Sequence, residues 1–272
     1  MDAFTRSFHG LVLHKGAIVF GFLVLFLIGG VLFPVAKRQV HPMHRIVKNL
    51  SVAGLNVLVS PLLVLPATLF AAQWALTWRP DWWQGGWGLL LDFVLLDAWL
   101  YVWHCANHVL PVLWRFHELH HLDETLDAST ALRFHFGAVI ASSLLRVVVI
   151  VLLGVPLTSV LLFETLVAMA AIFHHSNLRL PAAFERVLAW VIVTPSIHWV
   201  HHRAKRADTD SNYATVLSVW DWLFGTRSAT VRTADMQMGV EGVRDLGFVG
   251  LVVRPFSGLR LIRPNKFRSG RR

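Results

Sequence analysis

Cysteine and charged residues are both scarce in this chain. Its 272 residues include one cysteine, Cys105, and charged side chains make up only 15% of the total. A single thiol forms no intrachain disulfide and holds no iron–sulfur cluster, which excludes a disulfide-stapled domain and a cysteine-ligated redox centre. The low charge, together with 55% hydrophobic residues and a mean hydropathy of +0.56, indicates an integral membrane protein.

Acidic residues are the rarer charged class, with 16 of them against 25 lysines and arginines, so the formal net charge is +9. The basic residues flank apolar runs and fill the C-terminal segment, which predicts a positive-inside topology and contact with anionic lipid headgroups rather than with nucleic acid. The apolar run at 16–35 is followed by Lys37 and Arg38 without a small-residue cleavage site. This pattern predicts a retained span and not a cleaved signal peptide.

Long apolar runs dominate the first two thirds of the chain. They predict five spans, at 16–36, 50–76, 87–109, 137–154 and 157–174. The fold class is therefore an all-α integral membrane protein with four or five transmembrane or re-entrant helices. We expect kinks at Gly29-Gly30 in the first span and at Pro61 and Pro66 in the second.

The loops between the spans predict an orientation. The basic loop at 37–48 is expected on the cytoplasmic side, and the tryptophan-rich loop at 77–87 at the opposite interface. The third span then returns to the cytoplasmic side at His104 and His108, and the fifth returns there at 174–175. A histidine-rich helical cap is therefore expected at the cytoplasmic membrane face, and 181–193 has the pattern of a short amphipathic helix at that interface.

Eight histidines fall into three boxes with helical spacing. The pattern HxxxH is followed by two copies of HxxHH, made up of His104 and His108, then His117, His120 and His121, then His198, His201 and His202. Residues at i, i+3 and i+4 share one face of a helix, so each box directs its imidazoles to one region. Neutral imidazole is a good ligand for iron, zinc or copper, and this many imidazoles exceed the needs of one ion and suit two.

The motifs around these boxes resemble the fatty acid hydroxylase superfamily, also called the sterol desaturase family. The resemblance runs from Asp97 to about Thr226. Its segments, in chain order, are DAWLYVWHCANH (97–108), WRFHELHH (114–121), STALRFH (129–135), HHSN (174–177), TPSIHWVHH (194–202), DSNY (210–213) and WDWLFGT (220–226). Three departures are Cys105, where the family often has arginine, Phe136, where its R-x-H-P stretch has proline, and Ala138, where an acidic residue is usual. All three leave the histidine ligands in place.

The resemblance implies a membrane-embedded di-iron oxygenase that acts on lipids, with two iron ions as cofactor and O₂ as co-substrate. The box histidines carry over as metal ligands together with His175, and His135 and His174 are further candidates. Asp97 precedes His104 by seven residues on nearly the same helix face, so its carboxylate is expected to accept an imidazole N–H. The other residues expected to support the ligands are Asn177, Asn212, Tyr213 and Asp221. By contrast, His9, His14, His41 and His44 flank the first span and are interpreted as interface residues.

The expected domain organisation has three parts. Residues 1–86 form N-terminal transmembrane helices, 87–226 form the catalytic domain that resembles the fatty acid hydroxylases, and 227–272 form a basic cytoplasmic tail. We expect no electron carrier fused to these parts. A separate donor, either a cytochrome or a ferredoxin with its reductase, is therefore expected. The site is expected to face the cytoplasm from a bacterial inner membrane.

The chemistry expected is hydroxylation of an unactivated C–H bond of a lipid that enters from the bilayer, with O₂ and external electrons. Desaturation by the same di-iron site stays open, because loss of a second hydrogen gives a double bond. Two classes from outside this chemistry stay open as well. One is a bis-histidine haem protein that passes electrons across the membrane, and the other is a metal transporter or sensor, whose sites normally lie near the midplane among carboxylates.

Overall fold

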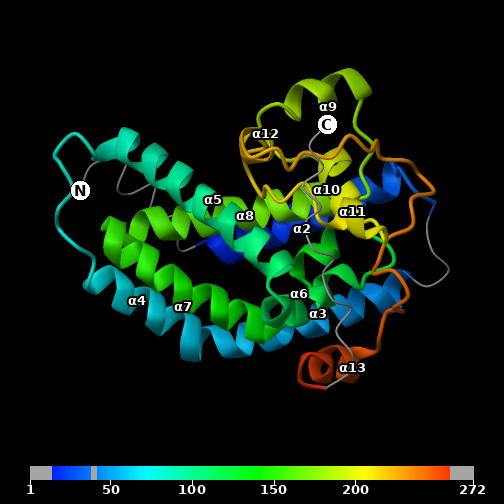
Figure 1. The fold of residues 1–272 in the computed structure, drawn as a ribbon, viewed down its shortest axis with the longest axis horizontal. Coiled ribbons are helices and arrows are strands. Elements are labelled where there is room, and N and C mark those ends of the chain that lie inside the picture. The colour runs from blue at the N-terminus through cyan, green and yellow to red at the C-terminus, as the bar shows by residue number, and fades with distance from the viewer. Residues whose placement is uncertain (1–13, 38–41, 258–272) are drawn as a thin grey trace.

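The computed structural model describes residues 14–37 and 42–257, and within these ranges the regular structure is helical. The membrane-spanning part contains α2 (Lys15–Leu32), α3 (Pro42–Val59), the π-helical turn η1 (Ser60–Val64), α4 (Leu65–Gln73), α5 (Gly85–Val109), α7 (Phe136–Leu153) and α8 (Leu157–His175). The remaining elements are α6 (Pro111–His121), η2 (Ala128–Leu132), α9 (Ala182–Leu188), α10 (Pro195–His201), α11 (Arg206–Thr209), α12 (Val219–Leu223), α13 (Phe248–Val253) and η3 (Arg254–Phe256). Figure 1 shows these shorter elements gathered at one end of the long helices.

Five helical segments within the described ranges are long and apolar enough to cross a membrane, which confirms the all-α membrane fold. The second segment runs from Pro42 to Gln73, whereas the sequence predicted a start near residue 50. This boundary was wrong because the polar first turns of α3 are satisfied by partners and do not need water. Arg45 and Asn49 are both buried there, and each contacts the carboxylate of Asp123.

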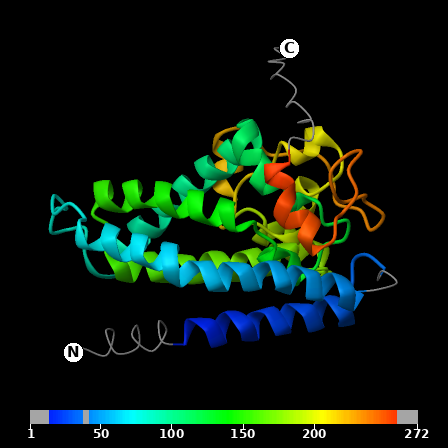
Figure 2. The same cartoon turned by 90° about the horizontal axis from the view of Figure 1, so that it is seen from below.

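The regular α-helical pattern changes in only one of the two spans where kinks were expected. At Pro61 the α-helix gives way to the π-turn η1, because proline has no amide hydrogen to continue the regular ladder. In α2, by contrast, the helix continues unbroken through Gly29 and Gly30. Gly30 serves packing instead, since a Cβ atom built there would lie 3.4 Å from Asn177. Figure 2 shows α2 lying along one side of the bundle below α3.

The tryptophan-rich loop lies at the end of the bundle opposite the histidines. The amide of Leu76 donates to the carbonyl of Val151 at 3.0 Å, and the indole of Trp78 donates to that of Leu152 at 2.7 Å. The loop therefore packs on the α7–α8 turn, where Gly154 takes a left-handed φ of 61°. Trp78, Trp82 and Trp87 are exposed there, as in an aromatic belt at a membrane interface.

Residues 227–257 fold back onto the end of the bundle that carries the histidines. Leu251 in α13 is buried in an apolar cluster with Val52 of α3 and Leu119 of α6, and Arg254 donates to Glu118 at 2.6 Å. The described part of the expected C-terminal tail is therefore packed structure. His9, Arg38, His41 and the basic residues at 268–272 lie outside the described residues.

Candidate metal centre

The structure gathers nine histidines into two buried groups. Each histidine offers one ring nitrogen, and the nitrogens of a group lie within 4.8 Å of one another, so each group could hold a metal ion. The first group contains His104, His108, His117, His121 and His201, and the second contains His120, His175, His198 and His202. These residues lie on α5, α6, α8 and α10 or directly after α10, at the end of the bundle where the spans meet the short helices.

Each HxxHH box divides its histidines between the two groups. In α6, His117 and His121 belong to the first group and His120 to the second. In the box that follows Pro195 the division is the opposite, because His201 belongs to the first group and His198 and His202 belong to the second. Adjacent helical residues differ by about 100° around the axis. The ring planes of His120 and His121 are 88° apart. Helical geometry thus separates neighbouring histidines of a box, and the packing of the helices decides which group each one joins.

Four of the six distances between the ring nitrogens of the second group are close to those around a single metal ion. Nε2 of His175 lies 3.1 Å from Nε2 of His120, 3.2 Å from that of His202 and 3.0 Å from that of His198. The Nε2 atoms of His198 and His202 are 3.1 Å apart. Four nitrogens at metal–nitrogen distances of about 2.1 Å would lie roughly 3.4 Å from one another in a tetrahedron. The donor set therefore fits one ion.

The first group leaves ring nitrogens buried without protein partners. Nε2 of His104 and Nε2 of His201 have no hydrogen-bond partner within the described ranges, and neither has either ring nitrogen of His108. Nε2 of His117 and Nε2 of His121 lie 3.2 Å apart. An unsatisfied buried polar nitrogen costs roughly 1–3 kcal/mol, so several together favour a bound cation that accepts their lone pairs.

Backbone carbonyls orient four of the rings by accepting from Nδ1. His104 donates to the carbonyl of Tyr213 and His201 to that of Ser211, each at 2.7 Å. In the second group, Nδ1 of His175 lies 2.7 Å from the carbonyl of Ala171, and Nδ1 of His120 lies 3.2 Å from that of Arg133. Because a carbonyl only accepts, Nδ1 carries the hydrogen and Nε2 keeps its lone pair for a metal.

Burial keeps the cap imidazoles neutral. Desolvation lowers the pKa of the box histidines that follow the third span well below its usual range, and repulsion between neighbouring rings lowers it further. The affected residues are His117, His120, His121, His198, His201 and His202. A neutral ring is the form that binds a metal, so at neutral pH these ligands need not lose a proton first.

The residues at 211–214 form a support for the first group, and α12 holds this support in place. Asp221 accepts from the amides of Tyr213 and Ala214 at 2.8 and 3.1 Å. Asn212 has a left-handed φ of 51°, donates to the carbonyl of Ile197 and accepts from the amide of Ser228. The predicted supporting residues Asn212, Tyr213 and Asp221 therefore lie next to the site. Tyr213 contributes its backbone carbonyl, and the side chains of Asn212 and Asp221 hold the surrounding backbone in place.

Asp97 and Asn177 contact other parts of the chain. The carboxylate of Asp97 accepts from the amide of Leu217 at 3.0 Å and from the indole of Trp220 at 2.8 Å. These bonds join α5 to α12 and the segment before it, and neither partner is an imidazole. Asn177 accepts from the amide of Ala36 at 2.9 Å and thereby fastens the end of α2 beside the second group. Both residues position elements that carry or surround ligands.

His135 and His174 lie outside both groups. Nδ1 of His135 accepts from the amide of Gly137 at 2.9 Å and caps α7, and its Nε2 lies 3.0 Å from the carbonyl of Val252. The ring of His174 packs on that of His198 with centroids 3.9 Å apart. In this structure His135 acts as a helix cap and His174 as a neighbour of a ligand.

Asp210 is a supporting residue that sequence reasoning did not select. One of its carboxylate oxygens lies 3.5 Å from Nδ1 of His108. Arg206 holds the other oxygen at 2.7 Å and also donates to the carbonyl of His108 at 3.1 Å. No helical spacing links Asp210 to a box. The only signal in the sequence was its place in the DSNY motif, two residues before Asn212.

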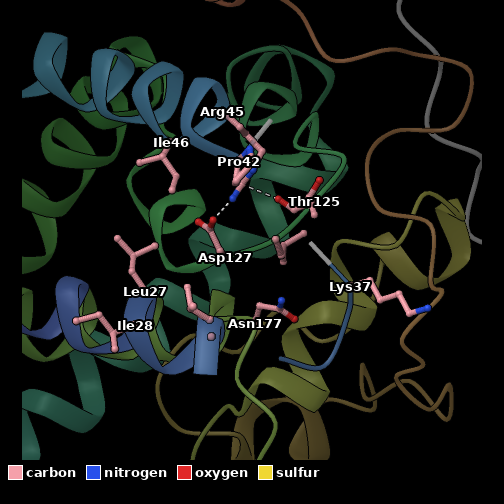
Figure 3. A pocket seen from close by; sticks show the side chains of 12 residues that line it. Leu27, Ile28, Lys37, Pro42, Arg45, Ile46, Thr125, Asp127 and Asn177 are labelled. Atoms are coloured by element: carbon pink, nitrogen blue, oxygen red, sulfur yellow. Dashed lines mark hydrogen bonds and ion pairs between the residues drawn. The ribbon is translucent and has the colours of Figure 1, made fainter. Parts of the chain in front are cut away.

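A pocket of about 230 Å³ lies between α2 and α3 near the second group. Leu27 and Ile28 form part of its apolar wall, and Arg45 lies at its polar side, where it forms an ion pair with Asp127 (Figure 3). Asn177, two residues after His175, also lines it. The pocket therefore combines an apolar side with a polar end at the level of the cap.

Comparison with known proteins identifies the class of this membrane metal site. The family model of the fatty acid hydroxylases matches residues 89–226. The match covers all nine grouped histidines and about half of the chain, and the chain belongs to the fatty acid hydroxylase family.

Individual relatives are lipid hydroxylases and monooxygenases. The chain is 31% identical to ornithine lipid hydroxylase OlsE of Rhizobium tropici over 70% of its own length and 58% of the relative's. It is 30% identical to human alkylglycerol monooxygenase over 54% of its length and 32% of the relative's. It is 24% identical to mouse cholesterol 25-hydroxylase over 84% and 80% of the two chains. The chain thus spans less than two thirds of the first two relatives, and no solved structure matches it.

Proposed function

We propose that this protein is a membrane-bound di-iron oxygenase that hydroxylates an unactivated C–H bond of a lipid with O₂ and external electrons. The observation that carries the proposal is the pair of buried groups made of imidazoles alone, with five donors in one and four in the other. An all-nitrogen donor set suits a redox-active first-row metal better than magnesium or calcium, which prefer oxygen ligands. Membership of the fatty acid hydroxylase family supports iron.

The protein's own contribution is binding, orientation and exclusion of water. His104, His108, His117, His121 and His201 would hold one ion, and His120, His175, His198 and His202 the other. Bound iron would supply the activation of O₂ and the removal of hydrogen from the substrate carbon. The carbonyls that accept from Nδ1 keep the ligand rings in their productive orientation, and the burial of both groups excludes bulk water.

The substrate class we propose is a membrane lipid with a long alkyl or acyl chain. The names of the relatives support it, because they include an ornithine lipid hydroxylase and an alkylglycerol monooxygenase. The apolar wall of the pocket between α2 and α3 offers one route by which a lipid chain leaves the bilayer at the level of the cap. The same names favour hydroxylation over desaturation as the outcome.

The proposal also includes the source of the electrons and the orientation of the protein in the membrane. The donor is a separate redox protein, either a cytochrome or a ferredoxin with its reductase. The cap faces the cytoplasm of a bacterium from its inner membrane. In support, basic residues are frequent at the end that carries the cap, as at Lys37, Arg179, Arg203 and Lys205, in agreement with the positive-inside rule.

Metal analysis of detergent-purified protein tests the proposal. We expect about two irons per chain, and about one in each of His201→Ala and His120→Ala, because these variants remove a donor from different groups. His44→Ala is the matched control, since His44 is exposed and outside both groups. Loaded protein should then add one oxygen atom to a lipid in a panel supplied with reductant and O₂. Absence of transition metal after anaerobic iron loading would overturn the proposal.

A further inference from the structure

Helix α9 has its polar and apolar sides reversed relative to a helix on a water-exposed surface. Its buried residue is Glu185, which accepts from the amide of Ser196 at 2.8 Å and from Arg232 at 3.0 Å. Phe184 and Val187 point away from the protein and are 56% and 70% exposed. A soluble surface normally shows the opposite arrangement.

Helix α12 lies beside α9 and extends the same apolar surface. A backbone bridge joins Ile192 to Leu217, and the indoles of Trp190 and Trp222 stack with centroids 5.0 Å apart and planes 7° apart. Leu223 and Phe224 are exposed next to Trp222. We call this surface the apolar lobe. It consists of Phe184, Val187, Trp190, Val191, Val219, Trp222, Leu223 and Phe224.

The apolar lobe continues the lipid-facing surface of the bundle. The ring of Phe224 stacks on that of Tyr101 in α5, with centroids 5.2 Å apart. Tyr101 lies eight residues before the end of this membrane-spanning helix at Val109, which corresponds to about 12 Å along the axis. α12 is therefore level with the last turns of a span, and Figure 1 shows α9 and α12 beside the bundle at its cap end.

The edge of the apolar lobe carries arginines suited to phosphate. The guanidinium of Arg227, a partly exposed residue, lies over the ring of Trp222 at 5.4 Å. Arg186 is exposed on α9. Tryptophan beside arginine is typical of the headgroup region, where the indole body meets acyl chains and the cation meets phosphate.

We propose that the apolar lobe is an interfacial anchor, which inserts α9 and α12 into the headgroup region of the membrane leaflet on the cap side. A bilayer fits better than a second copy of the chain, because the lobe joins a span that already faces lipid and carries cations at its edge. The anchor also supports the metal cap, since α12 contains Asp221, which holds the backbone of Tyr213 next to His104. This inference depends on the membrane spans and not on the chemistry proposed above.

Spin labels in nanodiscs containing anionic lipid test the anchor. In a Cys105→Ala background, a nitroxide is attached to Val187→Cys or to Leu223→Cys. Leu62→Cys, on the exposed surface of η1, serves as the lipid control, and Glu241→Cys, an exposed residue outside the spans, as the water control. Equal melting temperatures of all four variants in detergent establish that each is folded, so the readout depends neither on activity nor on bound metal.

We expect both lobe labels to collide with O₂ more often than the Glu241 label and less often than the deeper Leu62 label, and at least threefold less with a water-soluble nickel chelate than the Glu241 label does. Nickel accessibility at either lobe label equal to that at the Glu241 label would overturn the anchor. Dipolar broadening between labels on two chains would also overturn it, because it would show a second copy on the lobe.

Discussion

Nδ1 of His104 donates a hydrogen bond to the carbonyl oxygen of Tyr213, 2.7 Å away. The amide of the same residue, Tyr213, donates to the carboxylate of Asp221 at 2.8 Å. A ligand position in α5 is therefore fixed by a carboxylate in α12 through a single intervening residue. The contact explains how elements far apart in the sequence determine the direction of one imidazole lone pair.

Replacing Asp221 should weaken metal binding by the first group. In Asp221→Asn, an NH₂ donor would take the place of an acceptor that now receives the amides of Tyr213 and Ala214. Loss of a partner that orients a ligand typically costs about 10–100-fold in metal affinity. Chelator titration of the loaded protein should show one of two ions released at lower chelator concentration. Asp235→Asn is the exposed control, and retention of both ions as in the parent would contradict this role.

Asp210 should act on His108 without contributing much to the fold. Its carboxylate lies 3.5 Å from Nδ1 of His108, and a metal bound at Nε2 would polarise that N–H and strengthen the contact. We expect Asp210→Asn to lower metal affinity at the first group by about tenfold while the melting temperature changes little, because the side chain is partly exposed. Equal losses of stability and metal would show a structural role instead. Glu241→Gln serves as the control for removal of an acidic charge.

The buried charges between α3, η2 and the C-terminal segment should be essential to stability. Burial raises the pKa of Asp123, and Arg45 and Arg133 outweigh this effect, so the pKa is lowered and the group stays ionised. Removing one partner of such a network costs about 3–5 kcal/mol, because it leaves unpaired buried charge. Asp123→Ala should therefore lower the melting temperature in detergent sharply. It should also loosen the second group, since the carbonyl of Arg133 accepts from His120.

The control for Asp123→Ala is Glu124→Ala, because Glu124 is a neighbouring acid that is exposed. A melting temperature for Asp123→Ala within the range of this control would show that the network adds nothing to stability. A large decrease with full metal retention would separate the network from the metal site and contradict the proposed link through Arg133.

The metal-depleted protein should lose stability when the pH falls below the ordinary pKa of histidine. The pKa of six cap histidines is lowered by burial and by neighbouring rings, so at pH values just below about 6.5 the unfolded chain binds protons that the folded one excludes. Stability is then constant above this pH and decreases as the pH falls below it, by up to about 1.4 kcal/mol per unit for each group.

Melting temperatures of chelator-treated protein between pH 8 and pH 5 measure this decrease. His120→Ala should reduce its slope, because one group that resists protonation is gone, whereas the exposed His44→Ala should leave it unchanged. A melting temperature independent of pH over this range would show that the cap histidines are as accessible to protons in the folded state as in the unfolded one.

Much of the site could be predicted from spacing. The i, i+3 and i+4 intervals within 117–121 and 198–202 identified donors that do converge in space, and the apolar runs gave five spans with mostly small boundary errors. The start of the second span was the larger error. Its first turns are polar, and only the contact with Asp123 shows why Arg45 can be buried there.

Supporting contacts could be predicted less well, because most are made by backbone carbonyls. The acceptors for His104, His201 and His120 are the carbonyls of Tyr213, Ser211 and Arg133, and every residue type has a carbonyl. The helical spacing of Asp97 and His104 indicated an interaction, yet the carboxylate of Asp97 bonds to Leu217 and Trp220 of another segment. Asp210 carried no spacing signal at all.

The sequence by itself determined that this is a helical membrane protein whose histidines meet at one end, because hydropathy and helical periodicity are local properties. Only the tertiary structure decided how the histidines divide, with His117 and His201 in one group and His120 and His202 in the other. That division depends on the rotation and crossing of α5, α6, α8 and α10, which packing between distant segments fixes. The same packing forms the apolar lobe, because it places α12 beside the segment 181–193, for which the sequence predicted an interfacial helix on its own.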